Sequence, residues 1–253
     1  MAPKPSAGTT SAEFRFYEEL NDFLAPETRR RAFAVTIDRG RSVKDAIESL
    51  GVPHTEVDLI LVDGASVGFG HVLRGGERVA VYPVFERLDV TPLLHLRPRP
   101  LREPRFVADT HLGKLARHLR VAGFDCLWEN DFGDEEIVAY SVAQKRIILT
   151  RDLGILKRQA VERGHFVRAT ESGAQLREVV RAFQLENSLR PFTRCRACNV
   201  ELGEASKESV AERLPPEVRR RFDRFTECPQ CRRVFWRGTH YERLERLLRR
   251  AVE

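Results

Sequence analysis

The sequence has no long uninterrupted apolar run. One of its longest, Leu59–Val62, is far shorter than the roughly 20 residues that a helix needs to cross a bilayer. The first eleven residues, MAPKPSAGTTS, also lack an apolar stretch that could form the core of a signal peptide. These absences exclude a helical membrane protein. They predict a soluble, cytoplasmic chain with no membrane partner, in which residues 1–11 form a disordered tail.

Cysteine is scarce, with five residues in 253. Four of them form two Cys-x-x-Cys pairs with 29 residues between the pairs, which favours metal-bound thiolates in a reducing cytoplasm over disulfides. Two such pairs can close a tetrahedral structural Zn²⁺ site and leave no position open for a substrate. The fifth, Cys126, lies in an apolar segment and is expected to be a buried small hydrophobic residue. The predicted zinc ligands are Cys195, Cys198, Cys228 and Cys231.

Most of the chain has almost no net charge. Residues 1–100 carry 13 basic and 14 acidic side chains, and residues 101–189 carry 14 and 13. Residues 190–253 carry 16 and 10, so the net charge of +6 comes from this last quarter. A polyanion is therefore expected to bind there.

The residues before position 90 predict a small mixed sheet with one helix. Ser42 is expected to cap that helix, which runs to Leu50. The pattern resembles the β-grasp, ubiquitin-like fold and its sulfur-carrier branch, which acts through a Gly-Gly pair at a free C-terminus. Here Gly75-Gly76 is internal and is predicted to be a hairpin turn, so an interaction module for a protein partner is favoured over a sulfur carrier. The predicted strands are 14–17, 32–37, 59–62 and 78–82, and the predicted domain is 12–90.

Residues 105–189 alternate between strand and helix four times. Strands separated by helical crossovers predict a parallel sheet that is covered on both faces. The proline-rich residues 91–104 before it are expected to be a linker. The predicted strands are 105–108, 126–128, 147–149 and 165–167, and three of the predicted helices are 134–144, 154–163 and 174–185.

Three acidic residues are expected at one edge of this sheet. Asp109 and Asp152 directly follow apolar strands, and Asp134 opens the helix between those strands. Clustered carboxylates repel one another unless a cation neutralises them, and all-oxygen ligands suit Mg²⁺ or Mn²⁺. Such ions assist phosphodiester hydrolysis. The alternative is that Asp134 and Asp152 only cap helices.

Several sequence motifs resemble the Mut-seven C-terminal RNase domain family, a branch of the PIN-like nucleases that ends in a zinc ribbon. These are FVADTHLGKLARHLRVAGFDC, DEEIVAYSVAQKRIILTRD, and PFTRCRACNVEL with CPQCRRVFWRGTHYERL, between about residues 104 and 245. A ubiquitin-like domain often precedes this family's nuclease domain. The resemblance implies an α/β architecture: a β-grasp module, a PIN-like Rossmannoid parallel sheet over 105–189, and a zinc ribbon with a basic C-terminal helix over 190–253.

The resemblance also implies which residues act. Asp109, Asp134 and Asp152 match the metal-binding acids of PIN-like nucleases, and Glu135 is a neighbouring candidate. Thr150 matches the threonine of the family's Thr-x-Asp motif. The fourth acid has no clear match, and Glu171 is the nearest candidate.

Basic and aromatic side chains are candidates for RNA contact. Arginine can contact phosphates and stack on bases, and an exposed aromatic ring offers a stacking surface. In the ribbon, Phe222, Phe225 and Phe235 could instead pack its core, whereas Trp236 and Tyr241 are expected to be exposed. The predicted RNA-binding residues are Lys114, Arg117, Arg151, Arg232, Arg233, Trp236 and Arg237.

The sequence thus predicts a metal-dependent ribonuclease with catalytic Mg²⁺ or Mn²⁺ and structural Zn²⁺, whose ribbon assists RNA binding. The pattern does not distinguish tRNA, rRNA and mRNA as substrates. The alternative is a non-catalytic RNA- or ribosome-binding adaptor that uses the PIN-like fold as a scaffold.

Overall fold

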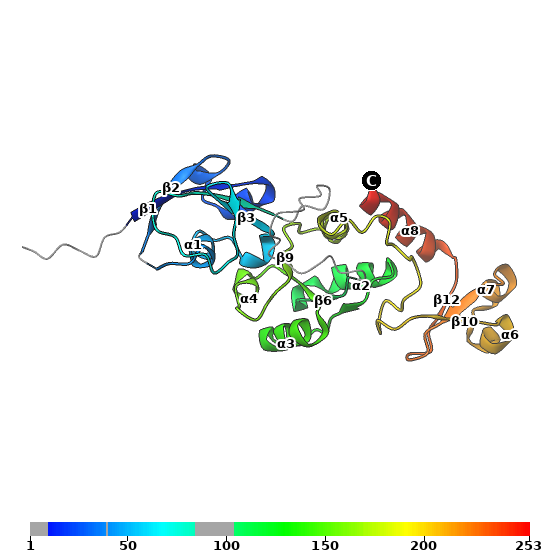
Figure 1. The fold of residues 1–253 in the computed structure, drawn as a ribbon. Helices are drawn as coiled ribbons and strands as arrows, with labels where there is room; N and C mark the ends of the chain where they lie inside the picture. The colour runs from blue at the N-terminus through cyan, green and yellow to red at the C-terminus, as the bar shows by residue number, and fades with distance from the viewer. Residues whose placement is uncertain (1–9, 39, 84–103) are drawn as a thin grey trace, which may run out of the picture. The chain divides into compact units, whose positions relative to one another are not determined.

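A computed structural model of the chain describes residues 10–38, 40–83 and 104–253 (Figure 1). Residues 91–103 of the predicted linker 91–104 therefore lie outside the described residues, as do the first nine residues of the predicted tail. By their internal contacts, the residues form two compact units. Among the described residues, the N-terminal unit comprises 10–38, 40–83 and 152–166, and the C-terminal unit comprises 104–151 and 167–253. Within the described ranges, no helix is long and apolar enough to span a membrane.

The N-terminal unit contains a five-stranded mixed sheet in the order β2-β1-β5-β3-β4. Strands β1 and β5 are parallel at its centre, and the other neighbours are antiparallel. Helix α1 (Val43–Ser49) contributes Ile47 to the core beside Phe14 and Val81 of the sheet, which confirms the β-grasp prediction. The strands are β1 (Thr10–Phe16), β2 (Phe33–Ile37), β3 (Leu59–Val62), β4 (Ala65–Ser66) and β5 (Arg78–Tyr82), and short 3₁₀ turns cover Glu18–Phe23, Pro26–Thr28 and His54–Glu56.

Local sequence signals explain the start of α1 and the turn before β5. The Ser42 hydroxyl accepts a hydrogen bond from the Asp45 amide at 3.1 Å, as expected for an N-cap. Gly75 and Gly76 both have positive φ, which is accessible to glycine. They form a bend that leads into β5. Strand β5 pairs with β1 and β3 and not with the preceding strand β4, so the prediction of a hairpin turn at Gly75-Gly76 was wrong.

The structure also corrects two predicted boundaries in this unit. Strand β1 already begins at Thr10, so the last two residues of the predicted disordered tail are paired in the sheet. The helix predicted over 154–163 is only one turn long, α4 (Leu153–Leu156). Tertiary hydrogen bonds hold the residues that follow it: the Val161 carbonyl contacts His54 Nε2 at 2.9 Å. Strand β9 covers Gly164–Phe166.

The C-terminal unit contains a parallel sheet, as predicted. Strand β6 pairs in parallel with β7 on one side and with β8 on the other. From β6 the chain first crosses to β7 and then returns past β6 to β8, so the strand order reverses at β6. The carboxyl ends of β6 and β8 therefore form a topological switch point, where ligands bind in open α/β sheets. The strands are β6 (Phe106–Ala108), β7 (Cys126–Leu127) and β8 (Ile147–Thr150).

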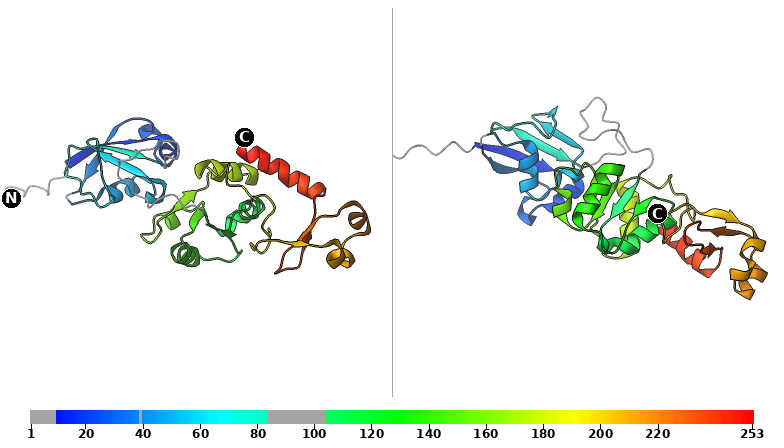
Figure 2. Two further views of the ribbon diagram at one scale, coloured as in Figure 1. Left: turned by 45° about the vertical axis from the view of Figure 1, so that its right-hand side comes forward. Right: turned by 90° about the horizontal axis from the view of Figure 1, so that it is seen from below.

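Helices flank this sheet on both faces. Right-handed crossovers require α2 and α3 to lie on opposite faces, because the two connections run in opposite directions across the sheet. Helix α5 packs against α2, and the C-terminal helix α8 lies beside α5 (Figures 1 and 2). The helices are α2 (Gly113–Val121), α3 (Asp134–Gln144), α5 (Ser172–Ala182) and α8 (Thr239–Val252), with a 3₁₀ turn at Thr110–Leu112.

A small antiparallel sheet, in the order β10-β11-β12, forms the ribbon. Its core contains Val210, Leu214 and Phe225, with Phe222 packed against them. Two of the three phenylalanines that could fill this core therefore do so. The elements are β10 (Gly203–Ala205), α6 (Lys207–Val210), a 3₁₀ turn at Ala211–Arg213, α7 (Pro216–Arg221), β11 (Phe225–Glu227) and β12 (Val234–Phe235).

Candidate metal centre and acidic site

The four cysteines predicted to bind zinc lie together. Their sulfur atoms are all within 4.8 Å of one another, and the Cys195 and Cys231 sulfurs are 3.9 Å apart. Tetrahedral zinc with Zn–S bonds of about 2.3 Å requires sulfur separations of about 3.8 Å. The cluster therefore fits a structural Zn²⁺ ion. Cys126 is fully buried away from this cluster, and burial raises the pKa of its thiol to about 12, which fits its predicted role as a small hydrophobic residue.

The two Cys-x-x-Cys turns share one backbone conformation. In each, the amide of the second cysteine donates to the sulfur of the first, at 3.5 Å for Cys198 and 3.4 Å for Cys231. The next residue, Asn199 or Arg232, has positive φ and donates its amide at 2.9 Å to the carbonyl of the first cysteine. Each turn therefore places its two thiols by local hydrogen bonding.

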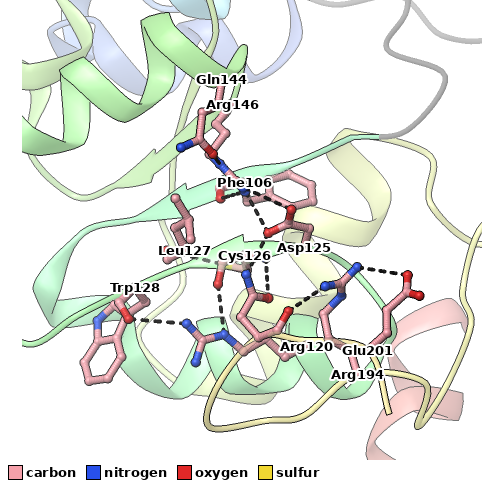
Figure 3. Close-up of polar contacts among 11 residues, drawn as sticks. Phe106, Arg120, Asp125, Cys126, Leu127, Trp128, Gln144, Arg146, Arg194 and Glu201 are labelled. Carbon is pink, nitrogen blue, oxygen red and sulfur yellow. Dashed lines mark hydrogen bonds and ion pairs between the residues drawn. The ribbon is translucent and has the colours of Figure 1, made fainter. Parts of the chain in front are cut away.

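A buried arginine joins the first cysteine turn to the parallel sheet. Arg120 is 3% exposed, and its Nε donates to the Cys126 carbonyl at 2.9 Å (Figure 3). Its Nη1 donates to the carbonyls of Arg196 at 3.2 Å and Ala197 at 2.7 Å, which lie between Cys195 and Cys198. No local pattern in the sequence distinguishes Arg120 from a solvated arginine on the polar face of a helix.

A second, partly buried network reinforces the same junction. Arg146 donates to both Asp125 oxygens, at 2.8 and 3.0 Å (Figure 3). The Asn199 side chain donates to Asp125 at 2.7 Å and accepts from the Cys126 amide at 3.0 Å. Burial opposes ionisation of Asp125, but the hydrogen bonds from Arg146 and Asn199 outweigh it and lower the pKa of Asp125.

Asp109 and Thr150 form a buried pair at the switch point. Asp109 directly follows β6 and is 7% exposed, and Thr150 ends β8 and is fully buried. The Thr150 hydroxyl donates to Asp109 Oδ2 at 2.7 Å, and the neighbouring Thr110 hydroxyl donates to Oδ1 at 3.1 Å. A buried carboxylate at the carboxyl ends of two neighbouring strands is thus fixed in orientation by hydroxyl groups.

Trp128 contacts Thr110, the residue after Asp109, and no sequence motif indicates it as a site residue. Its indole Nε1 donates to the Thr110 carbonyl at 3.0 Å. A side chain at position 113 would collide with the indole ring, which explains why glycine begins α2. The guanidinium of Arg117 lies 5.2 Å from the Trp128 ring centre, within the range of a cation–π interaction. Lys114, on the same helix, is exposed.

The other predicted acids lie at the first residues of helices. Asp134 and Glu135 are exposed at the start of α3, and the N-cap of that helix is Gly133. The interpretation of Asp134 as a helix cap was therefore wrong. The carboxylate that bonds to the N-cap backbone is that of Glu136, which accepts a hydrogen bond from the Gly133 amide at 3.0 Å.

Asp152, in the N-terminal unit, is the N-cap of α4. Its Oδ1 accepts from the Gly154 amide at 2.6 Å, so the capping interpretation of this residue is confirmed. Glu171, the candidate fourth acid, caps α5 in the same way. It accepts from the amides of Gly173 and Ala174 at 2.7 and 2.9 Å, and the hydrogen bond from Ala174 contributes most to lowering the pKa of Glu171.

Among the described residues, the four cysteines form the one group of three or more His, Cys, Asp or Glu side chains close enough to share a metal ion. The three predicted acids are not part of such a group. Within its own unit, Arg151 donates from Nη1 to the carbonyls of Val167, Arg168 and Ala169, at 3.3, 2.9 and 2.7 Å. These bonds give Arg151 a structural role. Its RNA contact stays a prediction.

Three of the four ribbon residues predicted to bind RNA line one cavity: Arg233, Trp236 and Arg237. Arg232 instead forms an ion pair with Glu227 at 2.9 Å. Trp236 packs against the ribbon core, so the expectation that its ring is simply exposed was wrong.

Fold and site together define an α/β protein with a ubiquitin-like N-terminal module and a four-cysteine ribbon. Residues 9–89 match the family described as Mut7-C ubiquitin, and residues 104–248 match the family described as Mut7-C RNAse domain. The second match covers more than half of the 253 residues. The chain therefore belongs to the Mut7-C RNase domain family.

Two solved structures are similar to part of the chain. They are the small archaeal modifier protein 1 of H. volcanii (18% identity, TM-score 0.24, 29% of this chain and 97% of that one) and SAMP1 from Haloferax volcanii (19% identity, TM-score 0.25, 30% and 97%). No curated protein matches the chain.

Proposed function

We propose that this protein is a ribonuclease that hydrolyses RNA phosphodiester bonds at the switch point of its parallel sheet. The observation that carries the proposal is the buried Asp109–Thr150 pair, in a chain that belongs to an RNase domain family. Asp134, Glu135 and Asp152 are the further acids that we assign to this reaction. For Asp152 the assignment rests on its place in the chain, two residues after Thr150.

The donor set at Asp109 suits a hard divalent cation. A carboxylate oxygen is a preferred ligand of Mg²⁺ or Mn²⁺. Either ion, when bound, would lower the pKa of a water and stabilise negative charge on the phosphate. The role of Thr150 is to hold the Asp109 carboxylate in one orientation, because its hydroxyl donates directly to Oδ2.

Basic side chains of α2 would position the substrate. Lys114 and Arg117 are exposed on the helix that follows Asp109, where they can contact flanking phosphates. The ring of Trp128 orients Arg117 through the cation–π contact. In the ribbon, zinc would stabilise the fold. The residues that would bind RNA there are Arg232, Arg233, Trp236 and Arg237. The ubiquitin-like module would bind a protein partner.

The test compares the wild-type protein with Asp109→Asn on labelled single-stranded and structured RNAs. Both proteins are first stripped of loosely bound divalent ions and checked for retained zinc, and Mg²⁺ or Mn²⁺ is then added. We expect metal-dependent cleavage by the wild type and a loss of at least about 100-fold in Asp109→Asn, comparable to the removal of one essential electrostatic group. Asp38→Asn, at an exposed aspartate outside the site, is the matched control and should cleave normally.

Two outcomes would contradict the proposal. If Asp109→Asn cleaves as fast as the wild type, the activity does not reside at this pair. If both proteins bind RNA and neither cleaves it with any metal, the chain is an RNA-binding adaptor and not an enzyme. No observation favours the ribosome as the target of such an adaptor.

A further inference from the structure

A large cavity lies in the C-terminal unit, between the ribbon and the first turns of α8. Its volume is about 880 Å³, which is within the range of pockets that enclose small organic ligands. The walls come from the loop that leads into Cys195, from strands β11 and β12, and from residues 236–244. The zinc ligands do not line it, so zinc binding does not occupy this space.

One wall of the cavity is a stack of flat side chains. The rings of Phe192 and Tyr241 are stacked with centroids 3.8 Å apart and an angle of 23° between their planes. The Arg237 guanidinium lies 5.4 Å from the centre of the Tyr241 ring. Phe192 has positive φ, an uncommon conformation for a bulky residue, and its amide donates to the Val121 carbonyl at 2.8 Å. The backbone is thus constrained to hold this ring against Tyr241.

The remaining walls are strongly basic. Five arginines line the cavity against two carboxylates, those of Glu204 and Asp223. Two of these arginines have partners: Arg194 is 3.5 Å from Glu201, and Arg196 Nη1 donates to His240 Nε2 at 2.8 Å. All five are arginines and not lysines, so each brings a planar group that can both bind phosphate and stack. The set is Arg194, Arg196, Arg224, Arg233 and Arg237.

We propose that this cavity binds unpaired nucleotides of a single-stranded RNA. A base would continue the stack formed by Arg237, Tyr241 and Phe192, and the cavity arginines, Arg237 included, would contact the flanking phosphates. A base in a duplex is already stacked and paired, so the cavity selects single-stranded segments. An acidic peptide could satisfy the arginines but offers no ring to the aromatic wall. The choice of RNA as the polyanion rests on the proposed ribonuclease function.

Binding and cleavage can be tested separately. Fluorescence anisotropy would measure the affinity of the zinc-loaded protein, without added Mg²⁺ or Mn²⁺, for a labelled single-stranded RNA and for a hairpin of the same composition. The variants are Tyr241→Leu, which removes the ring, and Arg237→Gln, which removes an exposed charge and leaves the core intact. Arg243→Gln is the matched control, because Arg243 is exposed on α8 and does not line the cavity.

We expect Tyr241→Leu to weaken single-stranded binding by about 5- to 100-fold, the effect of losing one base-stacking contact. Arg237→Gln should weaken it and reduce the slope of log affinity against log salt concentration by about 0.7, as for one lost phosphate contact on a single strand. Arg243→Gln should bind like the wild type, and the hairpin should bind more weakly than the single strand. Zinc content and circular dichroism would show that each variant is folded.

The proposal is overturned if a folded Arg237→Gln variant binds the single strand with unchanged affinity and salt dependence, or if the hairpin binds as well as the single strand. It is also overturned if a polyglutamate peptide binds the cavity and single-stranded RNA does not. Cleavage by the wild type combined with unchanged binding by the cavity variants would reject the cavity proposal alone. Unchanged cleavage by Asp109→Asn would reject the proposed active site alone.

Discussion

The two candidate metal sites of this protein differ in how far the folded chain assembles them. At the cysteine site, all four ligand atoms lie within 4.8 Å of one another. At the acidic site, the described residues bring together one carboxylate and its hydroxyl partner, Asp109 and Thr150. Asp134 and Glu135 are exposed at the start of α3, and Asp152 caps α4.

The difference follows from the range of the interactions that position the ligands. Each cysteine pair belongs to one tight turn, and the hydrogen bonds of that turn fix both sulfurs. The acids belong to separate segments, and like charges approach closely only when a cation offsets their repulsion. The cysteine cluster is therefore complete in the fold, whereas the described acids are held in separate segments.

The largest effect is expected for Cys228→Ser, which removes one zinc ligand. Because zinc binding by such sites is coupled to folding and supplies about 10 kcal/mol in isolated peptides, the ribbon should lose zinc and unfold. Zinc content and thermal unfolding would be measured. Cys126→Ala, at the buried cysteine outside the cluster, should keep its zinc. Full zinc occupancy in Cys228→Ser would show that Cys228 is not a required ligand. The cysteine cluster would then not be a complete four-ligand site, in contrast to what is inferred above.

A smaller effect is expected for Arg146→Met. This change removes a side chain from the Asp125 network that joins the parallel sheet to the first cysteine turn, and it tests how much that network contributes to stability. The change leaves Asp125, whose side chain is 23% exposed, without its bidentate partner, and breaking such a partly buried ion pair costs about 3 kcal/mol, the low end for buried pairs. Urea unfolding should show this loss while zinc is retained, because the cysteine turns are untouched. Arg249→Met, at an exposed ion pair with Glu245, should change stability by less than about 1 kcal/mol. Equal effects of the two changes would show that the Asp125 network contributes little.

The smallest effect on stability is expected for Thr150→Val at the acidic site. The change keeps the shape of the side chain but removes the hydroxyl that donates to Asp109, at a cost of about 1–3 kcal/mol. RNA cleavage should fall as well, because the carboxylate loses its orientation, and Thr150→Ser should restore most of both properties. A stable Thr150→Val variant with normal cleavage would show that Thr150 does not position Asp109.

Much of the fold was predictable because its signals are local or periodic. The helix over 134–144 has the predicted bounds, and the parallel pairing of β6 and β8 follows from strands joined through helices. The four-cysteine cluster was predictable from the spacing of its two Cys-x-x-Cys pairs. The short α4 was not, because the hydrogen bonds that hold the residues after it come from His54, more than 100 positions away.

The sequence by itself determined the members of the four-cysteine cluster, the strand that leads into Asp109 and the basic character of the last quarter of the chain. Each is set by residues close together in the sequence or by composition. Only the tertiary structure decided that Thr150 donates to Asp109, that Arg120 joins the cysteine turn to the sheet, and that Phe192 stacks on Tyr241. These contacts join residues 41 or more positions apart, and their partners are fixed by how the strands and helices pack, which no local pattern of residues encodes.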